Sequence, residues 1–387
     1  MSALRKPQPI KVLHLISSLD VGGAEQNLLR LTSSMDYAHF NSMVVSMTDI
    51  GPVGEELRRQ DITVHALNMK KGLPDPRGIY HLRTVLSLYQ PDIIQCWMYH
   101  ANLFGLLFSH NKTLVWNIRC SDMDLSRYGL VYRYTVKAGS IFSRIPNAVV
   151  ANSFAGRIYH EGLGYKSRRW EVIPNGFDTD RFRPDAGSRK RLRDELGIPE
   201  DAPVIGLIAR YDPMKDHETF FHAARLFITS RPCVQFILTG KEITPDNPAF
   251  HRLIGEHTSG RFHLLGQRQD IPDILNALDI STSSSMSEGL SNTIGEAMAT
   301  GIPCVVTDTG DSGVLVGDTG NVVPKKNPEA LCAAWAQLLD EGPEHLRALG
   351  TKARKRIQQH YSQYSTTRNY ETLYADLMDK PETENRS

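Results

Sequence analysis

The residues best suited to chemistry are two glutamates, Glu288 and Glu296, in the segment SEGLSNTIGEAMATGIPCVVT. Glu288 precedes a predicted helix, in a Gly-Leu-Ser loop. Free backbone amides at a helix start can hold a diphosphate, and a carboxylate beside them can accept hydrogen bonds from sugar hydroxyls. Thr293 and Glu296, however, have the T-x-x-E spacing of a capping box, which gives Glu296 a purely structural interpretation. The residue types alone leave a ligand site and a capped helix as equally good alternatives.

Two cations, Arg210 and Lys215, follow a predicted strand at residues 204–209. A planar guanidinium and a mobile ammonium suit two different phosphate oxygens, but by type alone the pair is more simply explained as solvated. The turn Gly22-Gly23 lets a ligand approach the backbone closely. It is also common for structural reasons, and no GxGxxG fingerprint follows it.

The elements that must position these residues alternate between short apolar runs and 3.6-period segments, the pattern of βα units around parallel sheets. In the first series, the expected strands are residues 10–17, 41–47, 62–66, 93–96, 113–118 and 148–151, and the expected helices are residues 24–34, 53–60, 80–89 and 101–110. In the second series, the expected strands are residues 204–209, 234–239, 262–265, 280–283 and 304–307, and the expected helices are residues 217–228, 272–277, 293–299 and 328–339.

The two series predict two doubly wound α/β domains facing each other across a cleft, with ligands at the carboxyl ends of the strands. We expect an N-terminal domain at residues 1–180 and a C-terminal domain at residues 202–365. Residues 181–201, which are rich in charge, Pro and Gly, are the expected linker. Residues 366–387 are expected to form an amphipathic helix that ends in a polar tail.

Charge and cysteine content exclude several classes of protein. The 387 residues carry 44 basic and 43 acidic side chains, so the chain is not a nucleic-acid-coating protein. Residues 1–199 carry a net charge of +8 and residues 200–387 one of −7, which suggests two units that face different partners.

The five cysteines form no CxxC or Cys/His pattern, so we expect neither disulfides nor a zinc site, and a reducing cytoplasm as the location. No apolar run approaches the ~18 residues that a membrane span needs.

Further motifs extend along nearly the whole chain: KVLHLISSLDVGGAEQNLLRL near the start, VVANS at 149–153, VIPNGFDTDRFRP at 172–184, IARYDPMKDH at 208–217, GQRQDIPDILNALDI at 266–280 and GNVVPKKNPEAL at 320–331. Together with the two glutamates, their order and spacing resemble the family-four retaining glycosyltransferases of the GT-B fold. The resemblance implies two facing Rossmann-like domains. It also implies an N-terminal domain that binds acceptor, a C-terminal domain that binds a nucleotide sugar, and a final helix that crosses back onto the first domain.

The resemblance assigns roles by position. Arg210 and Lys215 match the two cations that clamp the donor diphosphate, and such a clamp is needed because the phosphates gain charge as the glycosidic bond breaks. Glu288 matches the residue that contacts the transferred sugar, and Glu296 the one that accepts the ribose hydroxyls. The other donor-binding candidates are Gly22 and Gly23 of the glycine-rich loop, Gly289, Leu290 and Ser291 with their backbone amides, and Gly266 and Arg268 near the base.

One segment departs from the family pattern. Many members have a His near the reaction centre where this chain has Arg119, in VWNIRCSDMD. Because an arginine cannot act as a base, Arg119 is interpreted as a ligand of an anionic donor group or acceptor. His100 and Asn102, in YHANLFG, are the remaining polar candidates on the acceptor side.

The sequence therefore predicts a retaining, metal-independent glycosyltransferase of the hexosyl- or N-acetylhexosaminyl-transferase type. It would move a sugar from a nucleotide-diphosphate sugar, UDP favoured over GDP, to a hydroxyl acceptor in polysaccharide, lipid-linked glycan or glycoconjugate biosynthesis. The nucleotide sugar is a substrate, and no cofactor, metal or nucleic-acid partner is expected. Two alternatives stay open: a nucleotide-sugar epimerase of the GT-B fold, and a non-catalytic relative that binds nucleotide or glycan.

Residues 126–144 mix arginine and lysine with tyrosine, isoleucine and phenylalanine. A basic helix with aromatic side chains can lie against anionic lipid. An ordinary surface helix that covers the sheet is the simpler interpretation. The alternative to a purely cytoplasmic location is therefore a peripheral one, at the inner face of the membrane.

Overall fold

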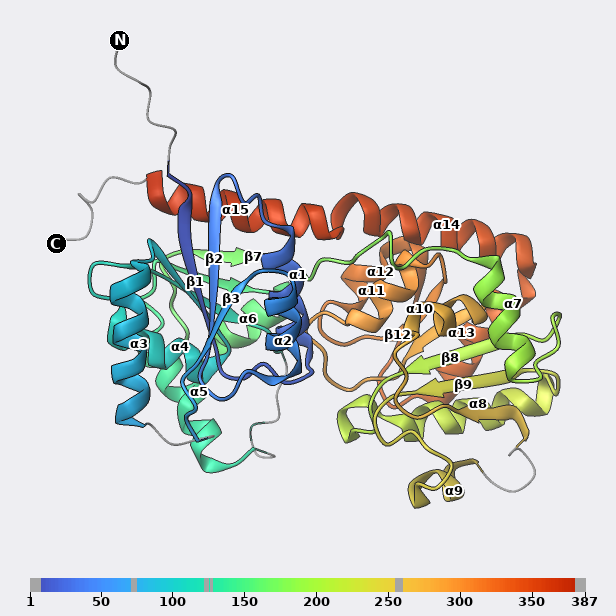
Figure 1. The fold of residues 1–387 in the computed structure, drawn as a ribbon. Coiled ribbons are helices and arrows are strands. Elements are labelled where there is room, and N and C mark those ends of the chain that lie inside the picture. Colours follow the sequence, from blue (N-terminus) through green and yellow to red (C-terminus); the bar gives the residue numbers. More distant parts are fainter. Residues whose placement is uncertain (1–7, 71–74, 122–124, 126–127, 255–259, 380–387) are drawn as a thin grey trace, which may run out of the picture. The chain divides into compact units, whose positions relative to one another are not determined.

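The computed structural model describes residues 8–70, 75–121, 125, 128–254 and 260–379 (Figure 1). The chain divides into two compact units, of which unit 1 comprises residues 1–176 and 363–387 and unit 2 comprises residues 177–362. Each unit is built around one parallel sheet with helices, so the predicted α/β class with two Rossmann-like domains is confirmed.

The sheet of unit 1 has the strand order β3-β2-β1-β4-β5-β6-β7, and every neighbouring pair is parallel. Its strands are β1 (Ile10–Ile16), β2 (Phe40–Ser46), β3 (Thr63–Ala66), β4 (Ile93–Trp97), β5 (Thr113–Ile118), β6 (Ala148–Ala151) and β7 (Trp170–Val172). The sequence pattern predicts the first six and misses β7, whose three residues are too few to show a period. The strand order reverses between β1 and β4, which is where sheets of this kind open a crevice for a ligand.

Helices cover both faces of this sheet. They are α1 (Gly23–Ser34), α2 (Gly51–Arg59), α3 (Pro76–Tyr89), α4 (Tyr99–Gly105), α5 (Leu130–Phe142), α6 (Phe154–Gly162), α15 (Gln363–Asp379) and the short 3-10 helix η1 (Leu106–Phe108). Side chains alternate along β1, so Val12 and Ile16 enter the core on one face while Leu13 and Leu15 enter the core on the other.

Helix α15 packs into unit 1 although it comes from the end of the chain. Its residues Tyr370, Leu373 and Tyr374 lie in the same core as Val12. The hydroxyl of Tyr370 accepts a hydrogen bond from Asn117 Nδ2 at 2.7 Å, and the hydroxyl of Tyr374 donates one to a buried side-chain oxygen of β4. The polar tail expected after this helix lies outside the described residues.

The sheet of unit 2 has the strand order β10-β9-β8-β11-β12-β13, again parallel throughout. Its strands are β8 (Val204–Ile208), β9 (Gln235–Thr239), β10 (Phe262–Leu264), β11 (Ile280–Ser283), β12 (Cys304–Thr307) and β13 (Gly320–Val323). The helices are α7 (Ala186–Glu195), α8 (His217–Ser230), α9 (Pro248–Ile254), α10 (Ile271–Ala277), α11 (Asn292–Ala299), α12 (Ser312–Val316), α13 (Pro328–Asp340) and α14 (Gly342–His360), with 3-10 turns η3 (Pro213–Lys215) and η5 (Gly317–Thr319). The sequence pattern misses β13, the short helices α9 and α12, and the long helix α14. Helix α14 is charged along most of its length and buries only a few small or aliphatic residues, so it shows no clear apolar period.

The segment expected to be a linker, residues 181–201, instead contains helix α7 and belongs to unit 2. Arg193 of this helix is 3% exposed and forms an ion pair of 2.8 Å with Asp279. Its guanidinium also donates to the carbonyl groups of Ala277, Glu200 and Ala202. Part of the charge that suggested an exposed linker therefore belongs to Arg193, which is buried and connects α7 to the start of β11.

We expect Arg193→Ala to lower the free energy of unfolding of unit 2 by about 3 kcal/mol, because it removes the buried guanidinium that bonds Asp279 Oδ2 and the carbonyl groups of Ala277, Glu200 and Ala202. Lys190→Ala, on the exposed side of the same helix, should stay close to wild type because its ion pair with Asp194 is solvated. Urea unfolding followed by circular dichroism measures both variants. Equal stability of the two would contradict the role assigned to Arg193.

Candidate active site

The candidate site of unit 2 lies where the strand order reverses, between β8 and β11. Lys215 follows β8, and Glu288 follows β11. Because neighbouring parallel strands end at the same edge of the sheet, these two loops meet at the point where ligands bind in sheets of this kind. The residues after β12 reach the same edge.

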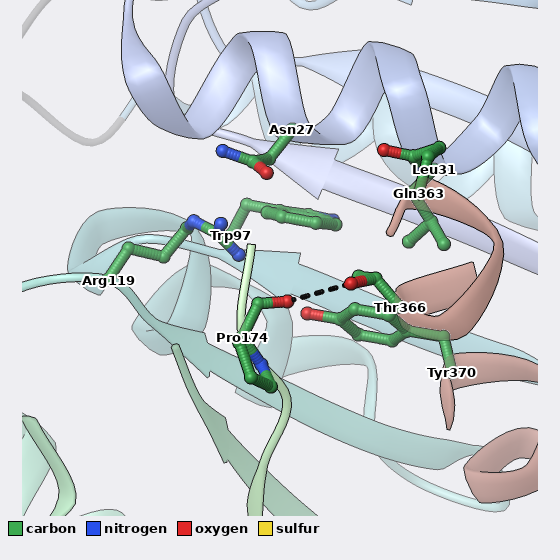
Figure 2. Close-up of a pocket in the computed structure, with 8 residues that line it drawn as sticks. All are labelled: Asn27, Leu31, Trp97, Arg119, Pro174, Gln363, Thr366 and Tyr370. Atoms are coloured by element: carbon green, nitrogen blue, oxygen red, sulfur yellow. Dashed lines mark hydrogen bonds between the residues drawn. The ribbon is translucent and has the colours of Figure 1, made fainter. Parts of the chain in front are cut away.

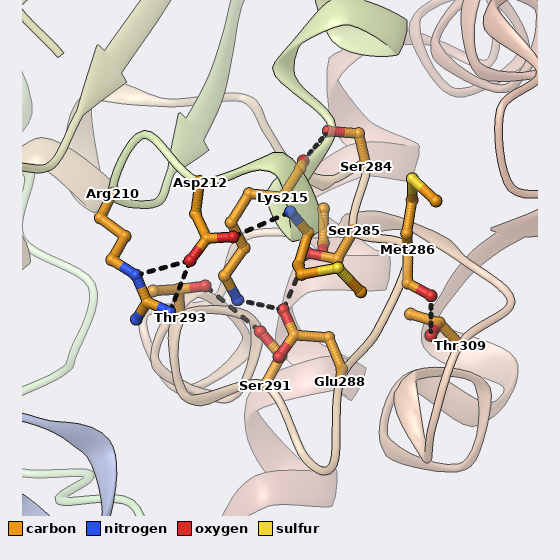
Figure 3. Close-up of polar contacts among 12 residues, drawn as sticks. Arg210, Asp212, Lys215, Ser284, Ser285, Met286, Glu288, Ser291, Thr293 and Thr309 are labelled. Atoms are coloured by element: carbon orange, nitrogen blue, oxygen red, sulfur yellow. Dashed lines mark hydrogen bonds and ion pairs between the residues drawn. The ribbon is translucent and has the colours of Figure 1, made fainter. Parts of the chain in front are cut away.

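Figure 3 shows the central contact, an ion pair between the Lys215 ammonium and Glu288 Oε1. The two side chains are 21% and 12% exposed, so water screens them only in part. The same oxygen, Oε1, accepts a hydrogen bond of 2.8 Å from the hydroxyl of Ser285. The structure thus brings together one of the two expected phosphate ligands and the expected sugar ligand.

Arg210, the other expected phosphate ligand, lies with Asp212 instead. Its Nε and Nη2 atoms donate to Asp212 Oδ2 at 3.0 and 2.8 Å, and its side chain is 64% exposed. Burial raises the pKa of Asp212, but the Met214 amide and the Arg210 guanidinium outweigh that effect and hold the pKa below its ordinary value. Asp212 therefore stays ionised, and it holds Arg210 beside the turn that carries Lys215.

Glu296 is not part of a capping box, and that interpretation was wrong. Helix α11 begins at Asn292, so Thr293 is its second residue and Glu296 its fifth, two residues beyond the position that a capping-box glutamate occupies. Ser291 precedes the helix, and its hydroxyl lies 3.3 Å from that of Thr293. Glu296 is buried within the helix, beside the same edge of the sheet.

The loop that carries Glu288 is fixed through its backbone and through Leu290, whose side chain lies in the core of unit 2. The Asp311 amide donates to the Gly289 carbonyl at 3.0 Å. Gly310 has a φ of +54°, and a Cβ at this position would lie 2.0 Å from the carbonyl oxygen of Glu288. Gly310 is a positioning residue that sequence reasoning missed; its signal is the Thr-Gly pair directly after a predicted strand.

Gly266 and Arg268 contact other parts of unit 2. The Gly266 carbonyl accepts from the Gly240 amide at 2.8 Å and the Thr239 hydroxyl at 2.7 Å, at the end of β9. The Arg268 guanidinium forms two bonds with Asp270, at 2.8 and 2.6 Å, which raise the pKa of Arg268. The structure therefore gives both residues local partners.

In unit 1, Gly22 directly precedes helix α1, with extended backbone. A Cβ at Gly22 would lie 2.3 Å from Oε2 of Glu25, so the carboxylate of Glu25 lies over the start of the helix, next to Gly22-Gly23. Burial raises the pKa of Glu25. In this structure, the group that approaches Gly22 closely is therefore the carboxylate of Glu25.

Arg119 lies beside a small cavity of unit 1, shown in Figure 2. Its guanidinium stacks on the Trp97 ring at 5.2 Å and donates to side-chain oxygens of Asn117 and Asn175. Burial lowers the pKa of Arg119, but an arginine keeps its proton. The cavity is lined by Asn27, Leu31, Trp97, Arg119, Pro174, Gln363, Thr366 and Tyr370.

The two acceptor-side candidates on α4 differ. Asn102 is buried, and its side-chain amide bonds the carbonyl and the amide of Asn117, at 3.3 and 3.4 Å. Asn102 therefore ties α4 to β5, and its assignment as an acceptor ligand stays a prediction. His100 is half-buried against the Tyr132 ring, and burial lowers its pKa.

Among the residues that the structure describes, no group of three or more His, Cys, Asp or Glu side chains could hold a metal ion. The five cysteines, all of them in the described part of the chain, are free. No described helix is long and apolar enough to cross a membrane.

Two family models match the chain, one over each unit. "Glycosyltransferase Family 4" matches residues 21–181, and "Glycosyl transferases group 1" matches residues 202–341. The expected family is confirmed by these two matches together.

Curated relatives and solved structures agree with the family models. The chain is 25% identical to the lipopolysaccharide core biosynthesis mannosyltransferase LpsB of Rhizobium meliloti, over 82% of this chain and 90% of that protein. It is 26% identical to an Escherichia coli UDP-Gal:alpha-D-GlcNAc-diphosphoundecaprenol alpha-1,3-galactosyltransferase, a match that spans about half of each protein, 54% of both. The structure of Anabaena HepE in complex with UDP superposes with a TM-score of 0.83 at 21% identity, over 95% of this chain and 100% of that one, and it supports the fold.

The backbone of Gly310 provides a test of how the site is held. We expect Gly310→Ala to destabilise unit 2 by more than about 1 kcal/mol, because alanine disfavours a positive φ and its Cβ would meet the Glu288 carbonyl. Gly313→Ala, in helix α12 where the nearest atom is 3.6 Å from the added Cβ, should be neutral or stabilising. Urea unfolding compares the pair, and a harmless Gly310→Ala would refute the close approach.

Proposed function

The chain belongs to the glycosyltransferases with a Family 4 domain and a group 1 domain, and we propose that it transfers a sugar from a nucleotide-diphosphate sugar to a hydroxyl acceptor with retention of configuration. The observation that carries the proposal is the contact between Lys215 and Glu288 at the reversal point of the unit 2 sheet. This contact places a cation suited to phosphate beside a carboxylate suited to sugar hydroxyls. A nucleotide-sugar epimerase gains no support, because the matched relatives named above are transferases.

In the proposed reaction, the bond between the anomeric carbon and the diphosphate oxygen breaks while the acceptor oxygen bonds to the same face of that carbon. The leaving phosphate takes the acceptor's proton. Lys215 stabilises the growing negative charge, which is the largest electrostatic demand of the reaction. Arg210 supplies the second cation when its long, exposed side chain turns from Asp212 to a phosphate oxygen.

Glu288 would hold the transferred sugar, and Glu296 the ribose hydroxyls of the nucleotide. Gly289, Leu290 and Ser291 would offer their backbone amides to the diphosphate, because they lie between Glu288 and the start of α11. In unit 1, Arg119 would bind an anionic group of the donor or acceptor. Its stacking on Trp97 fixes the plane of the guanidinium for that purpose.

A UDP-sugar is the proposed donor. The support comes from relatives: HepE structures are titled as complexes with UDP and with UDP-glucose, and the E. coli galactosyltransferase is named for UDP-Gal. The proposed acceptor is a glycan or a lipid-linked glycan, since the same E. coli enzyme is named for a diphosphoundecaprenol acceptor and the R. meliloti enzyme for lipopolysaccharide core. The reaction would then take place in the cytoplasm, at the inner face of the membrane.

Helix α5 offers a surface suited to that location. Side chains in a helix follow one another at about 100° per residue. Leu130, Val131, Tyr134, Ile141 and Phe142 therefore share one sector of about 120°, and all five are exposed. The opposite sector, with Val136 and Gly139, faces the core.

The charge of the same segment favours an anionic lipid surface as the partner of this apolar sector. Arg133, Lys137 and Arg144 are exposed at its border, and residues 128–145 contain no acidic side chain. Apolar side chains flanked by cations suit the boundary between lipid headgroups and acyl chains. Residues 126 and 127 of the segment singled out from the sequence lie outside the described residues.

Nucleotide binding tests the donor assignment. We expect UDP, in a thermal-shift comparison with GDP and ADP, to raise the melting temperature most, because a ligand of the folded state stabilises it. Lys215→Ala should weaken UDP binding about tenfold, by loss of one charge-assisted contact. Lys190→Ala, on α7, is the control and should bind UDP as wild type does. Equal UDP binding by wild type and Lys215→Ala would refute the phosphate role of Lys215.

Vesicle flotation tests the lipid surface, with vesicles of phosphatidylcholine alone or mixed with phosphatidylglycerol. We expect binding to the mixed vesicles, reduced about tenfold in the double variant Tyr134→Ser/Ile141→Ser by the loss of buried apolar area. Leu88→Ser, which removes an 82% exposed side chain from α3 of the same unit, is the control and should bind as wild type does.

Two results would contradict the lipid surface. One is equal vesicle binding by the double variant and wild type. The other is a wild-type dimer in light scattering that the double variant abolishes, which would make this face an interface between copies of the chain.

A further inference from the structure

Three consecutive serines, Ser283, Ser284 and Ser285, end strand β11 and begin the loop that carries Glu288. All three are buried. Serine hydroxyls withdrawn from water need hydrogen-bond partners, and those partners reveal what the segment holds in place. None of the sequence motifs described above assigns a role to these three hydroxyls.

The hydroxyl of Ser285 holds the carboxylate of Glu288. It donates to Oε1 at 2.8 Å and accepts a hydrogen bond from the Ser283 hydroxyl at 3.2 Å. The backbone of Ser285 is fixed as well, since its carbonyl accepts from the Thr307 hydroxyl at 2.6 Å. The donor to Glu288 is therefore held both from its own strand, β11, and from the neighbouring strand, β12.

The hydroxyl of Ser284 contacts the other half of the site. It donates to the backbone carbonyl of Lys215 at 2.8 Å. The neighbouring amide, that of Met286, donates to the Met214 carbonyl, also at 2.8 Å. These two bonds attach the turn that bears Lys215 to the serine segment (Figure 3).

We propose that Ser284 and Ser285 are positioning residues that act on different halves of the donor substrate. Ser284 sets the position of Lys215 and so acts on the diphosphate. Ser285 sets the position of Glu288 and so acts on the transferred sugar. The inference rests on the proposed function, because it takes from it which half of the donor each side chain contacts.

The shared oxygen gives Ser285 a particular task. In this structure, Lys215 and Ser285 both bond Oε1 of Glu288. When a phosphate group draws the Lys215 ammonium toward itself, the Ser285 hydroxyl remains bonded to that oxygen. A glutamate side chain has three rotatable bonds, so a fixed donor at one oxygen keeps the carboxylate aligned with the sugar during the exchange.

The two roles separate when UDP and UDP-glucose are compared as ligands by calorimetry. Ser285→Ala should leave the Kd of UDP within about twofold of wild type and raise that of UDP-glucose about fivefold to tenfold, the effect expected for one hydrogen bond to a charged group. Ser284→Ala should weaken the binding of UDP and of UDP-glucose by the same factor, because both ligands contain the diphosphate. Ser281→Ala removes a buried hydroxyl from the same strand that makes none of the hydrogen bonds described above, and it is the matched control. Melting curves of all four proteins check that each is folded.

The outcomes are distinct. If Ser285→Ala weakens the binding of UDP as much as that of UDP-glucose, Ser285 supports the whole loop. The proposal that it acts on the sugar alone is then overturned. If Ser285→Ala binds both ligands as Ser281→Ala does, Ser285 has no positioning role. If wild type binds neither ligand, the UDP-sugar donor fails first, and the inference falls with it before any variant is compared.

Discussion

The ion pair between Lys215 and Glu288 is the contact on which the loops of unit 2 depend. Both charges are largely withdrawn from water, and such a charge is tolerated only while its partner is present. The loops after β8 and β11 must therefore keep a fixed distance. The Ser284 hydroxyl holds the first loop, and Gly310 allows the backbone after β12 to support the second. The reversal of strand order makes room for the pair at this edge of the sheet.

Under the proposed function, the same pair would let an acidic half of the chain bind a diphosphate. Residues 200–387 carry a net charge of −7, so their total charge repels an anion. Lys215 and Arg210 are each held by a carboxylate, Glu288 and Asp212, which keeps the two cations near the edge of the sheet. A donor would then replace each carboxylate with a phosphate oxygen, and local geometry would decide the affinity.

Periodicity predicts the elements better than it predicts the contacts. Strands such as β5 and β8 are buried, mostly apolar runs, and their limits follow from the sequence to within a residue or two. Helix α7 was missed because its charges suggest solvent, whereas Arg193 is buried against Asp279, a residue far along the chain. The pair Lys215 and Glu288 spans 73 residues, so no spacing rule finds it, although the rule that parallel strands end at one edge brings their loops together. The false capping box shows the opposite error, since T-x-x-E fits locally but the residue that precedes the helix is Ser291, two residues before Thr293.

The division of charge along the chain has a structural counterpart in the two units. Residues 1–199 carry +8, and part of that excess borders the apolar sector of α5, while Arg119 is held in the interior of unit 1 by Trp97 and Asn175. Arg119 is thus built into the fold, and the exposed cations of α5 are not. A cation fixed among aromatic and amide groups selects a ligand by shape, whereas cations along a helix attract an anionic surface over a longer range. The basic half of the chain therefore contains two kinds of positive charge, and only the exposed kind depends strongly on ionic strength.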